Sequence, residues 1–213
     1  MSTETSLVRM LGGEVALETY KKGFISYIVS LIADGGDVNS SRSFMTPLMH
    51  AVSTEYPFPE LVQLLIEKGA DVNSQGDWIG IPLHIALENH VKAEVIQILL
   101  DAGSEVNILD DFDNTALMCA LMNRCDREVS RLLAKYGSEI RPMGEYNQEL
   151  LFRTITGMHD DTIVAMVLDA GWPANGVDED GLTPLMVAAC TGSHDQIFSL
   201  LLEKGSDIAS KDS

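Results

Sequence analysis

Lysine and arginine are scarce in this sequence. The 213 residues include 14 Lys and Arg against 32 Asp and Glu, so the formal net charge is −18. Contacts to phosphate groups need clustered basic side chains, so this balance argues against nucleic acid and against an anionic membrane surface as the main partner. An acidic chain of this kind favours solubility and basic proteins as partners.

Long apolar runs and paired cysteines are also missing. No segment approaches the roughly 18 consecutive apolar residues of a membrane span, and the N-terminus lacks the apolar core of a secretory signal. Cys119, Cys125 and Cys190 are an odd number without a Cys-x-x-Cys pair, which disfavours a disulfide framework or a four-ligand zinc site. We expect a reducing, cytoplasmic setting, with Cys119 and Cys190 buried in apolar segments and Cys125 exposed in a polar loop.

Catalytic motifs are lacking as well. The sequence has no Gly-rich phosphate loop, no Gly-x-Ser-x-Gly elbow and no His-Glu-x-x-His pair. His159, Asp160 and Asp161 are adjacent, so their side chains do not converge on a metal ion. The two aspartates are better suited to cap a helix that begins near Thr162. We therefore expect no enzyme activity, no metal and no cofactor.

What the sequence does contain is an internal repeat. A short phrase that begins with glycine starts at positions 35, 69, 103, 137, 171 and 205, with a constant step of 34 from each copy to the next. A clear copy is Gly69-Ala-Asp-Val-Asn73. A second phrase keeps almost the same phase, as in Thr46-Pro-Leu-Met-His-Ala51 and Thr183-Pro-Leu-Met-Val-Ala188. A repeat of this length is typical of solenoid proteins.

Each unit predicts two helices and a turn. Thr followed by Pro is a helix start, because Thr caps exposed N–H groups and Pro at the first helical position gives up no hydrogen bond. A second apolar stretch, such as Val95–Leu100, suits a helix buried on one face. The glycine after it suits the left-handed residue that ends a helix. One helix pair cannot bury its own apolar face, so the units must stack. A generic helical bundle is the alternative, but a bundle has no reason to keep a fixed period.

These residues make the chain resemble ankyrin-repeat proteins. The resemblance rests on the Thr-Pro-Leu-x-x-Ala segments, the Leu-Leu-x-x-Gly-Ala-Asp-Val-Asn segments and the stretch from Asp178 to Gly192. It extends from about Gly13 to Asp207. It implies an all-α solenoid of stacked antiparallel helix pairs with projecting hairpin-like loops, which we call fingers. It also implies a single domain that binds other proteins and has no chemistry of its own.

Six units are expected, at about 7–39, 40–73, 74–107, 108–141, 142–175 and 176–209. Unit 1 lacks Thr-Pro-Leu and is expected to be a divergent N-terminal cap. Its apolar side is expected to comprise Val8, Leu11, Val15 and Leu17. Unit 5 carries Leu150 and Thr154 in place of Pro and Ala, so we expect looser packing or a bend there. Unit 6 is close to the family pattern, although a terminal unit is normally polar on its outer face.

Aromatic residues recur at the finger tips. In the family, the tips and the exposed side of each first helix form the concave recognition surface. The position nine residues after each leading glycine is aromatic in four of five fingers, although aromatic residues are only 6% of the chain. This aromatic row consists of Phe44, Trp78, Phe112 and Tyr146, and Asp180 is the fifth residue at that position. The rings are either anchors for a partner or internal packing between neighbouring fingers.

Acidic residues surround the aromatic row. The expected partner-binding acids are Asp77, Asp111, Asp113, Glu145, Glu179 and Asp180, and the matching first-helix positions are Glu88, Met122 and Asn123. An acidic field around apolar anchors steers a basic surface into place. The other interpretation is that turns favour Asp for local hydrogen bonds whether or not anything binds.

The sequence therefore predicts a non-catalytic module that binds a protein partner with a basic surface. It acts as a scaffold, or as an inhibitor that occludes a site on the partner in the manner of an immunity protein. We expect a monomer without a nucleic-acid or membrane partner. Two alternatives stay open: a self-assembling structural unit that stacks through unit 6, and a fragment of a larger multidomain protein.

Overall fold

The structure, a computed structural model, describes residues 14–40, 45–53, 57–76, 80–141, 149–158, 160–192 and 195–209, apart from the side chains of 14–21, 24, 31 and 158. The described residues begin with the helix α2 (Glu14–Ala33). The helix pairs that follow are α3 (Pro47–Val52) with α4 (Pro59–Glu67), α5 (Pro82–Glu88) with α6 (Ala93–Asp101), α7 (Ala116–Met122) with α8 (Arg127–Lys135), α9 (Glu149–Met158) with α10 (Asp161–Asp169), and α11 (Pro184–Thr191) with α12 (Asp195–Glu203).

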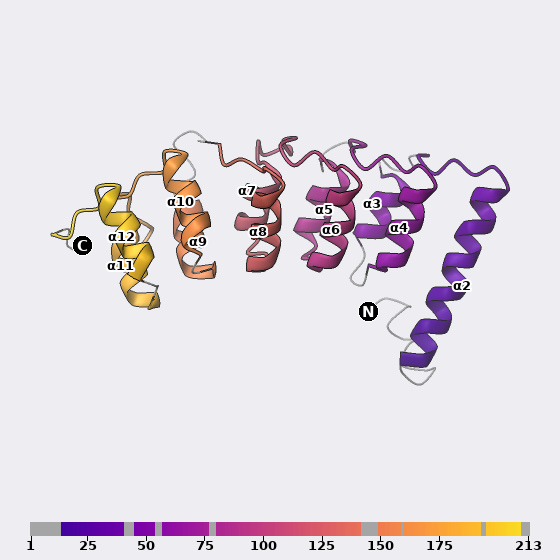
Figure 1. The fold of residues 1–213 in the computed structure, drawn as a ribbon, viewed down its shortest axis with the longest axis horizontal. Helices are drawn as coiled ribbons and strands as arrows, with labels where there is room; N and C mark the ends of the chain where they lie inside the picture. Colours follow the sequence, from indigo (N-terminus) through magenta and orange to yellow (C-terminus); the bar gives the residue numbers. More distant parts are fainter. Residues whose placement is uncertain are drawn as a thin grey trace.

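The pairs stack in two rows. The first helices α3, α5, α7, α9 and α11 each contact the next one along, and the second helices α4, α6, α8, α10 and α12 form the other row in the same way. Figure 1 shows the pairs side by side, with the loops between pairs along the upper edge and α2 and α12 at opposite ends. This arrangement is the all-α stack of antiparallel helix pairs that the repeat predicts.

Threonine caps start the first helices as the sequence predicts. The Oγ1 atom of Thr46 accepts a hydrogen bond from the Met49 N–H at 3.3 Å, and Thr115 and Thr183 make the equivalent bond. Unit 3 has Ile81 at this position and no side-chain cap. There the Nδ1 atom of His84 accepts from the Ile81 N–H at 3.4 Å. Both arrangements give a hydrogen-bond partner to a backbone N–H that has none within the helix.

Glycine ends the second helices in the left-handed conformation. The φ angles of the six leading glycines, at 35, 69, 103, 137, 171 and 205, lie between 83° and 100°. L-residues adopt this region only with strain, so the glycine that recurs once in every repeat meets a backbone requirement. This prediction from the sequence is confirmed at every unit.

Asparagine side chains join neighbouring units at four of the junctions. Asn107 donates its Nδ2–H to the Gly137 carbonyl at 3.0 Å, and its Oδ1 accepts from the Glu139 N–H at 2.8 Å. The same two bonds recur at each member of this asparagine ladder, which consists of Asn39, Asn73, Asn107 and Asn175. Because both bonds reach about one repeat ahead, the ladder sets the register between neighbouring units.

The asparagine ladder is interrupted between units 4 and 5. The position that should carry Asn is Arg141, and the position that should donate the backbone N–H is Pro173, which has none. Both partners of the missing hydrogen bond are therefore replaced at this junction. Arg141 has no amide oxygen that could accept it, and Pro173 has no N–H that could donate it. Other contacts hold this junction together. Arg153 donates from Nη1 to the Met122 carbonyl at 2.8 Å, and Arg127 pairs with Asp160 at 2.9 Å.

Burial follows position in the stack. Every residue from Pro82 to Leu87 in α5 and from Ala116 to Leu121 in α7 is buried, because a unit lies on each side of these helices. At the C-terminal end, α12 buries Ile197 and Leu201 against the unit before it. Among the exposed apolar side chains at this end, Ile208 is 77% exposed.

Units 1 and 5 differ from the other units. Within the described residues, unit 1 consists of one continuous 20-residue helix, Glu14–Ala33. Its predicted apolar residues Val8, Leu11, Val15 and Leu17 lie outside the described side chains. In unit 5, Leu150 and Thr154 are buried, and the Thr154 hydroxyl donates to the Leu150 carbonyl at 2.7 Å. The expected loose packing is therefore not found at these two positions, because the threonine satisfies its polar atom within its own helix.

The cysteines are also placed differently from the prediction. Cys119 is buried as expected, but Cys125 is buried and Cys190 is exposed. The loop that carries Cys125 folds back on the preceding unit, where the thiol donates to the Leu87 carbonyl at 3.3 Å. Cys190 lies two full repeats after Met122, on the side of its helix that faces solvent.

Candidate partner-binding surface

The finger of unit 4 is a tight hairpin organised by one aspartate. Asp110 is 8% exposed, and its Oδ1 accepts from the backbone N–H groups of Phe112 at 2.9 Å and Asn114 at 2.8 Å. The Asp110 N–H in turn donates to the Asn114 carbonyl at 3.0 Å. This pattern forces the three residues between them to the tip, with Asp113 at φ 61°. A turn of this kind favours Asp for local bonding.

The finger of unit 6 forms the same hairpin at the equivalent positions of its repeat. The Oδ1 of Asp178 accepts from the N–H groups of Asp180 and Leu182 at 3.0 and 2.8 Å, and Gly181 occupies the left-handed position. In unit 3 the N–H of Gly76 donates to the Gly80 carbonyl at 3.1 Å at the matching place. The phase of the repeat therefore extends to the finger hairpins.

These hairpins divide the acids of the fingers into two groups. Asp110 and Asp178 shape the turns through local hydrogen bonds. Asp111, Asp113, Glu179 and Asp180 are exposed at the tips, and their carboxylates form no hydrogen bond or ion pair with the other described residues. Asp77 and Glu145 lie outside the described residues. The exposed tip acids are available to charges on another molecule.

One member of the aromatic row can be placed. The Phe112 side chain is 71% exposed, so its ring is not buried against a neighbouring finger. It lies between the two exposed acids Asp111 and Asp113. Phe44, Trp78 and Tyr146 lie outside the described residues.

The predicted first-helix positions, which lie at the ends of α5 and α7, are less uniform. Glu88 is exposed to solvent as a whole residue. Partial burial of its carboxyl group and the negative charge of Asp110 both raise its pKa. Met122 and Asn123 are half-buried, and Asn123 donates its amide to the Cys119 sulfur at 3.3 Å. Met122 therefore offers some apolar surface at the end of α7, whereas Asn123 is partly engaged in ending this helix. Cys190 has the same phase as Glu88 and Met122, which is the signal that could have placed it on this face.

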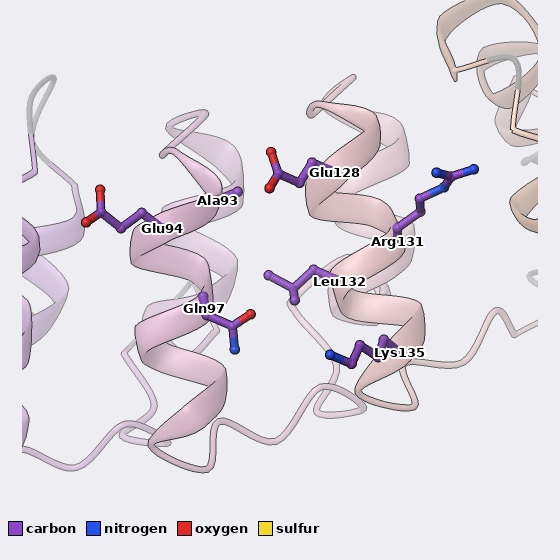
Figure 2. Close-up of a pocket in the computed structure, with 7 residues that line it drawn as sticks. All are labelled: Ala93, Glu94, Gln97, Glu128, Arg131, Leu132 and Lys135. Atoms are coloured by element: carbon purple, nitrogen blue, oxygen red, sulfur yellow. The ribbon is translucent and has the colours of Figure 1, made fainter.

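A groove on the opposite row of helices was not predicted. It lies between α6 and α8, has a volume of about 410 Å³, and is lined by Ala93, Glu94, Gln97, Glu128, Arg131, Leu132 and Lys135. Figure 2 shows Leu132 and Glu128 directed into it, whereas Arg131 points away toward the next pair. The basic residues at every fourth position of α8 were the available signal in the sequence.

Two kinds of feature are not found among the described residues. They contain no group of three or more His, Cys, Asp or Glu side chains arranged to bind a metal ion. No helix within the described ranges has both the length and the apolar composition to cross a membrane. Asp160 caps α10 through bonds from the Thr162 and Ile163 N–H groups, as the sequence predicts.

Comparisons with known proteins agree with this architecture. A family model of three ankyrin-repeat copies matches residues 48–143, and a single ankyrin-repeat model matches residues 180–213. A search of curated proteins gives no significant match. Among solved structures, the chain is similar to the ankyrin-repeat domain of Bcl-3, a member of the IkappaB protein family, with a TM-score of 0.58 and 22% sequence identity over 88% of this chain and 82% of that one. The chain belongs to the ankyrin-repeat family.

Proposed function

We propose that this protein is a binding module that recognises a partner with a basic surface through its fingers and the predicted positions at the ends of its first helices. Ankyrin repeats are typically protein–protein interaction modules, in a family that is generally non-catalytic. The observation that carries the proposal is the tip of unit 4, where an exposed phenylalanine lies between two exposed acids. The tip of unit 6, with Glu179 and Asp180, extends the acidic surface along the same edge.

The two residue types contribute differently to binding. Burial of an aromatic side chain at an interface supplies much of the affinity, and a central anchor changed to alanine costs about 2 kcal/mol or more. Exposed acids mainly steer the encounter with a basic partner and raise the association rate at low salt. The hairpin held by Asp110 presents both groups without a large ordering cost on binding. Scaffolding, or occlusion of a basic site on the partner as an immunity-type inhibitor does, follows from such a preformed surface.

Matched substitutions test this proposal. The chain is used to capture proteins from its native lysate, beside Phe112→Ala and the control Tyr27→Ala, which removes another exposed aromatic ring from α2. The captured protein is identified by mass spectrometry, purified and titrated by calorimetry. We expect Phe112→Ala to weaken binding roughly 30-fold or more, and Tyr27→Ala to leave it unchanged. Equal affinity of wild type and Phe112→Ala for that partner would contradict the proposal.

The charge argument has its own test. Asp111→Asn and Asp113→Asn remove two charges, and Asn tolerates the left-handed backbone at position 113. With the purified partner, we expect the double variant to associate more slowly at low salt and to show a weaker salt dependence. The control is Glu67→Gln with Glu203→Gln, which makes the same change of charge on second helices. An identical salt dependence of wild type and the finger variant would exclude a basic partner surface at this site.

Self-assembly is the second candidate function. Ile208 is 77% exposed and Leu202 is 41% exposed at the end of the stack, whereas Val106, at the position of Ile208 in an inner unit, is 8% exposed. Unit 6 therefore presents apolar surface of the kind that another unit covers inside the stack. We favour a monomer, because the acidic chain repels its own copies. We place it in a reducing cytoplasmic setting, as expected from its unpaired cysteines. Sedimentation at micromolar concentration decides this: a single species of 23.2 kDa excludes assembly.

A further inference from the structure

The second helix of unit 4 reverses the charge of its row. Helices α4, α6, α10 and α12 each contain two acidic residues and no Lys or Arg. Helix α8 contains three basic residues and one acid. Arg124 lies in the turn before it, and we call Arg124, Arg127, Arg131 and Lys135 together the basic face. The segment from Arg124 to Lys135 has four basic and two acidic residues, which is a local excess of positive charge in a chain of net charge −18.

The basic residues within α8 lie on its solvent side. Arg127, Arg131 and Lys135 are spaced by four residues, which places them along one face of a helix. The buried residues Val129 and Leu133 lie on the opposite face. The row is therefore presented outward, away from the first helices and the fingers.

One buried carboxylate fixes two of these arginines. The Oδ2 atom of Asp160 pairs with the Nε of Arg127 at 2.9 Å and with the Nε of Arg131 at 2.5 Å. The Asp160 side chain is fully buried, whereas the arginine side chains are 41% and 55% exposed. One negative charge thus holds two positive ones, and the group keeps a net positive charge at the surface. Arginines held by Nε can still donate from their terminal nitrogens to an anionic group.

The other two basic residues have no such partner. Within the described residues, Arg124 and Lys135 form no ion pair or hydrogen bond through their side chains. Figure 2 shows the Lys135 nitrogen at the mouth of the groove between α6 and α8, below Leu132. Ala93 and Leu132 give this groove apolar surface that a peptide side chain can cover, and Glu94 and Glu128 also line it.

We propose that the basic face of α8 binds a short acidic segment of a protein partner, at a site separate from the fingers. From Arg127 to Lys135 is about 12 Å along α8, the length of about four residues of extended chain. The acidic helices α6 and α10 border the site on both sides, so it is one helix wide. This geometry suits a narrow anion and opposes a nucleic acid duplex or a membrane surface, which would lie over the acidic neighbours as well.

A labelled acidic peptide tests the site directly. The probe is fluorescein-labelled hexaglutamate, and its anisotropy is followed at low ionic strength with the full chain. Arg124→Gln with Lys135→Gln removes two charges that have no structural partner. Lys68→Gln with Lys92→Gln removes two exposed charges elsewhere on the second-helix row, as the matched control. Because the chain repels polyanions overall, binding of this probe reports a local site.

We expect wild type and the control to bind the peptide, and the Arg124/Lys135 variant to bind about tenfold more weakly. Arg124→Lys with Lys135→Arg keeps the charges and should retain most of the affinity. Lack of binding by wild type, or equal weakening by the control, overturns the proposal. Tighter binding of a single-stranded DNA of matched charge also overturns it, because the site would then select phosphate rather than carboxylate. None of these outcomes depends on the fingers, so the experiment tests the acidic-peptide site on α8 independently of the proposed function.

Discussion

Repair of the interrupted asparagine ladder should couple positions 141 and 173, which lie in different units. The change is Arg141→Asn together with Pro173→Asp, which restores the residues found at the other junctions, such as Asn39 with Asp71. Arg141→Asn alone supplies an amide that can donate to the Gly171 carbonyl, but its oxygen has no N–H to accept from. Pro173→Asp alone supplies an N–H that has no acceptor. Only the double variant can form both bonds.

The magnitude follows from the intact steps. In these, the Nδ2-to-carbonyl distances are 2.7 to 3.1 Å and the N-to-Oδ1 distances are 2.7 to 2.9 Å. A net hydrogen bond contributes about 0.5–1.5 kcal/mol, and the lower half of this range applies because the ladder lies near solvent. Loss of proline costs roughly 0.4–1 kcal/mol through the unfolded chain. We therefore expect Pro173→Asp alone to destabilise, and the double variant to recover a coupling energy of about 0.5–1 kcal/mol.

Equilibrium unfolding in urea of the four proteins gives this coupling energy. The free energies are compared only where the m values agree, since a repeat array can lose two-state behaviour. Asn107→Ala is the control at an intact junction, where loss of both bonds should cost about 1–2 kcal/mol. If the two changes at the interrupted junction are additive within about 0.3 kcal/mol, the proposed geometry of the missing step is wrong.

Two further predictions concern buried groups. Asp160→Asn keeps a capping side chain on α10 but removes the charge that pairs with two arginines, and we expect a loss of about 1 kcal/mol at pH 7, since the arginines are partly exposed. Burial alone raises the pKa of Asp160, but the bonds from the arginines outweigh it and hold the pKa below 3.8. This stabilisation is therefore present above pH 3.8 and is lost as the pH falls through the folded-state pKa of Asp160. Equal urea midpoints for wild type and Asp160→Asn at pH 7 would contradict this prediction. A thiol reagent should label only Cys190 in the native chain, because burial raises the pKa values of Cys119 and Cys125, that of Cys125 to about 11. Mass spectrometry should count one adduct in the native chain and three in urea, and two native adducts would show that one of the buried thiols is accessible.

Short-range features could be predicted from the sequence because their partners are close along the chain. Thr46 and Thr183 bond to N–H groups three residues on, and the leading glycines answer a local backbone requirement. The constant repeat period then predicts the stack, since equal units that cannot bury their own apolar faces must cover one another. The finger tips follow from the same count. Whether the rings at those tips face a partner stays a prediction, although the exposure of Phe112 favours it.

Long-range features could not be predicted in this way, because position in the chain does not give the distance between side chains of different units. Cys125 looked exposed in a polar loop, but that loop folds against Leu87, 38 residues earlier. Asp160 could be recognised as a helix cap, but not as the partner of two arginines in the preceding unit. The sequence by itself determined the units, their caps and their stacking order through local bonding and apolar periodicity. Only the tertiary structure decided which charges meet across units and which side chains stay in solvent, because these depend on packing between helices that the chain brings together only on folding.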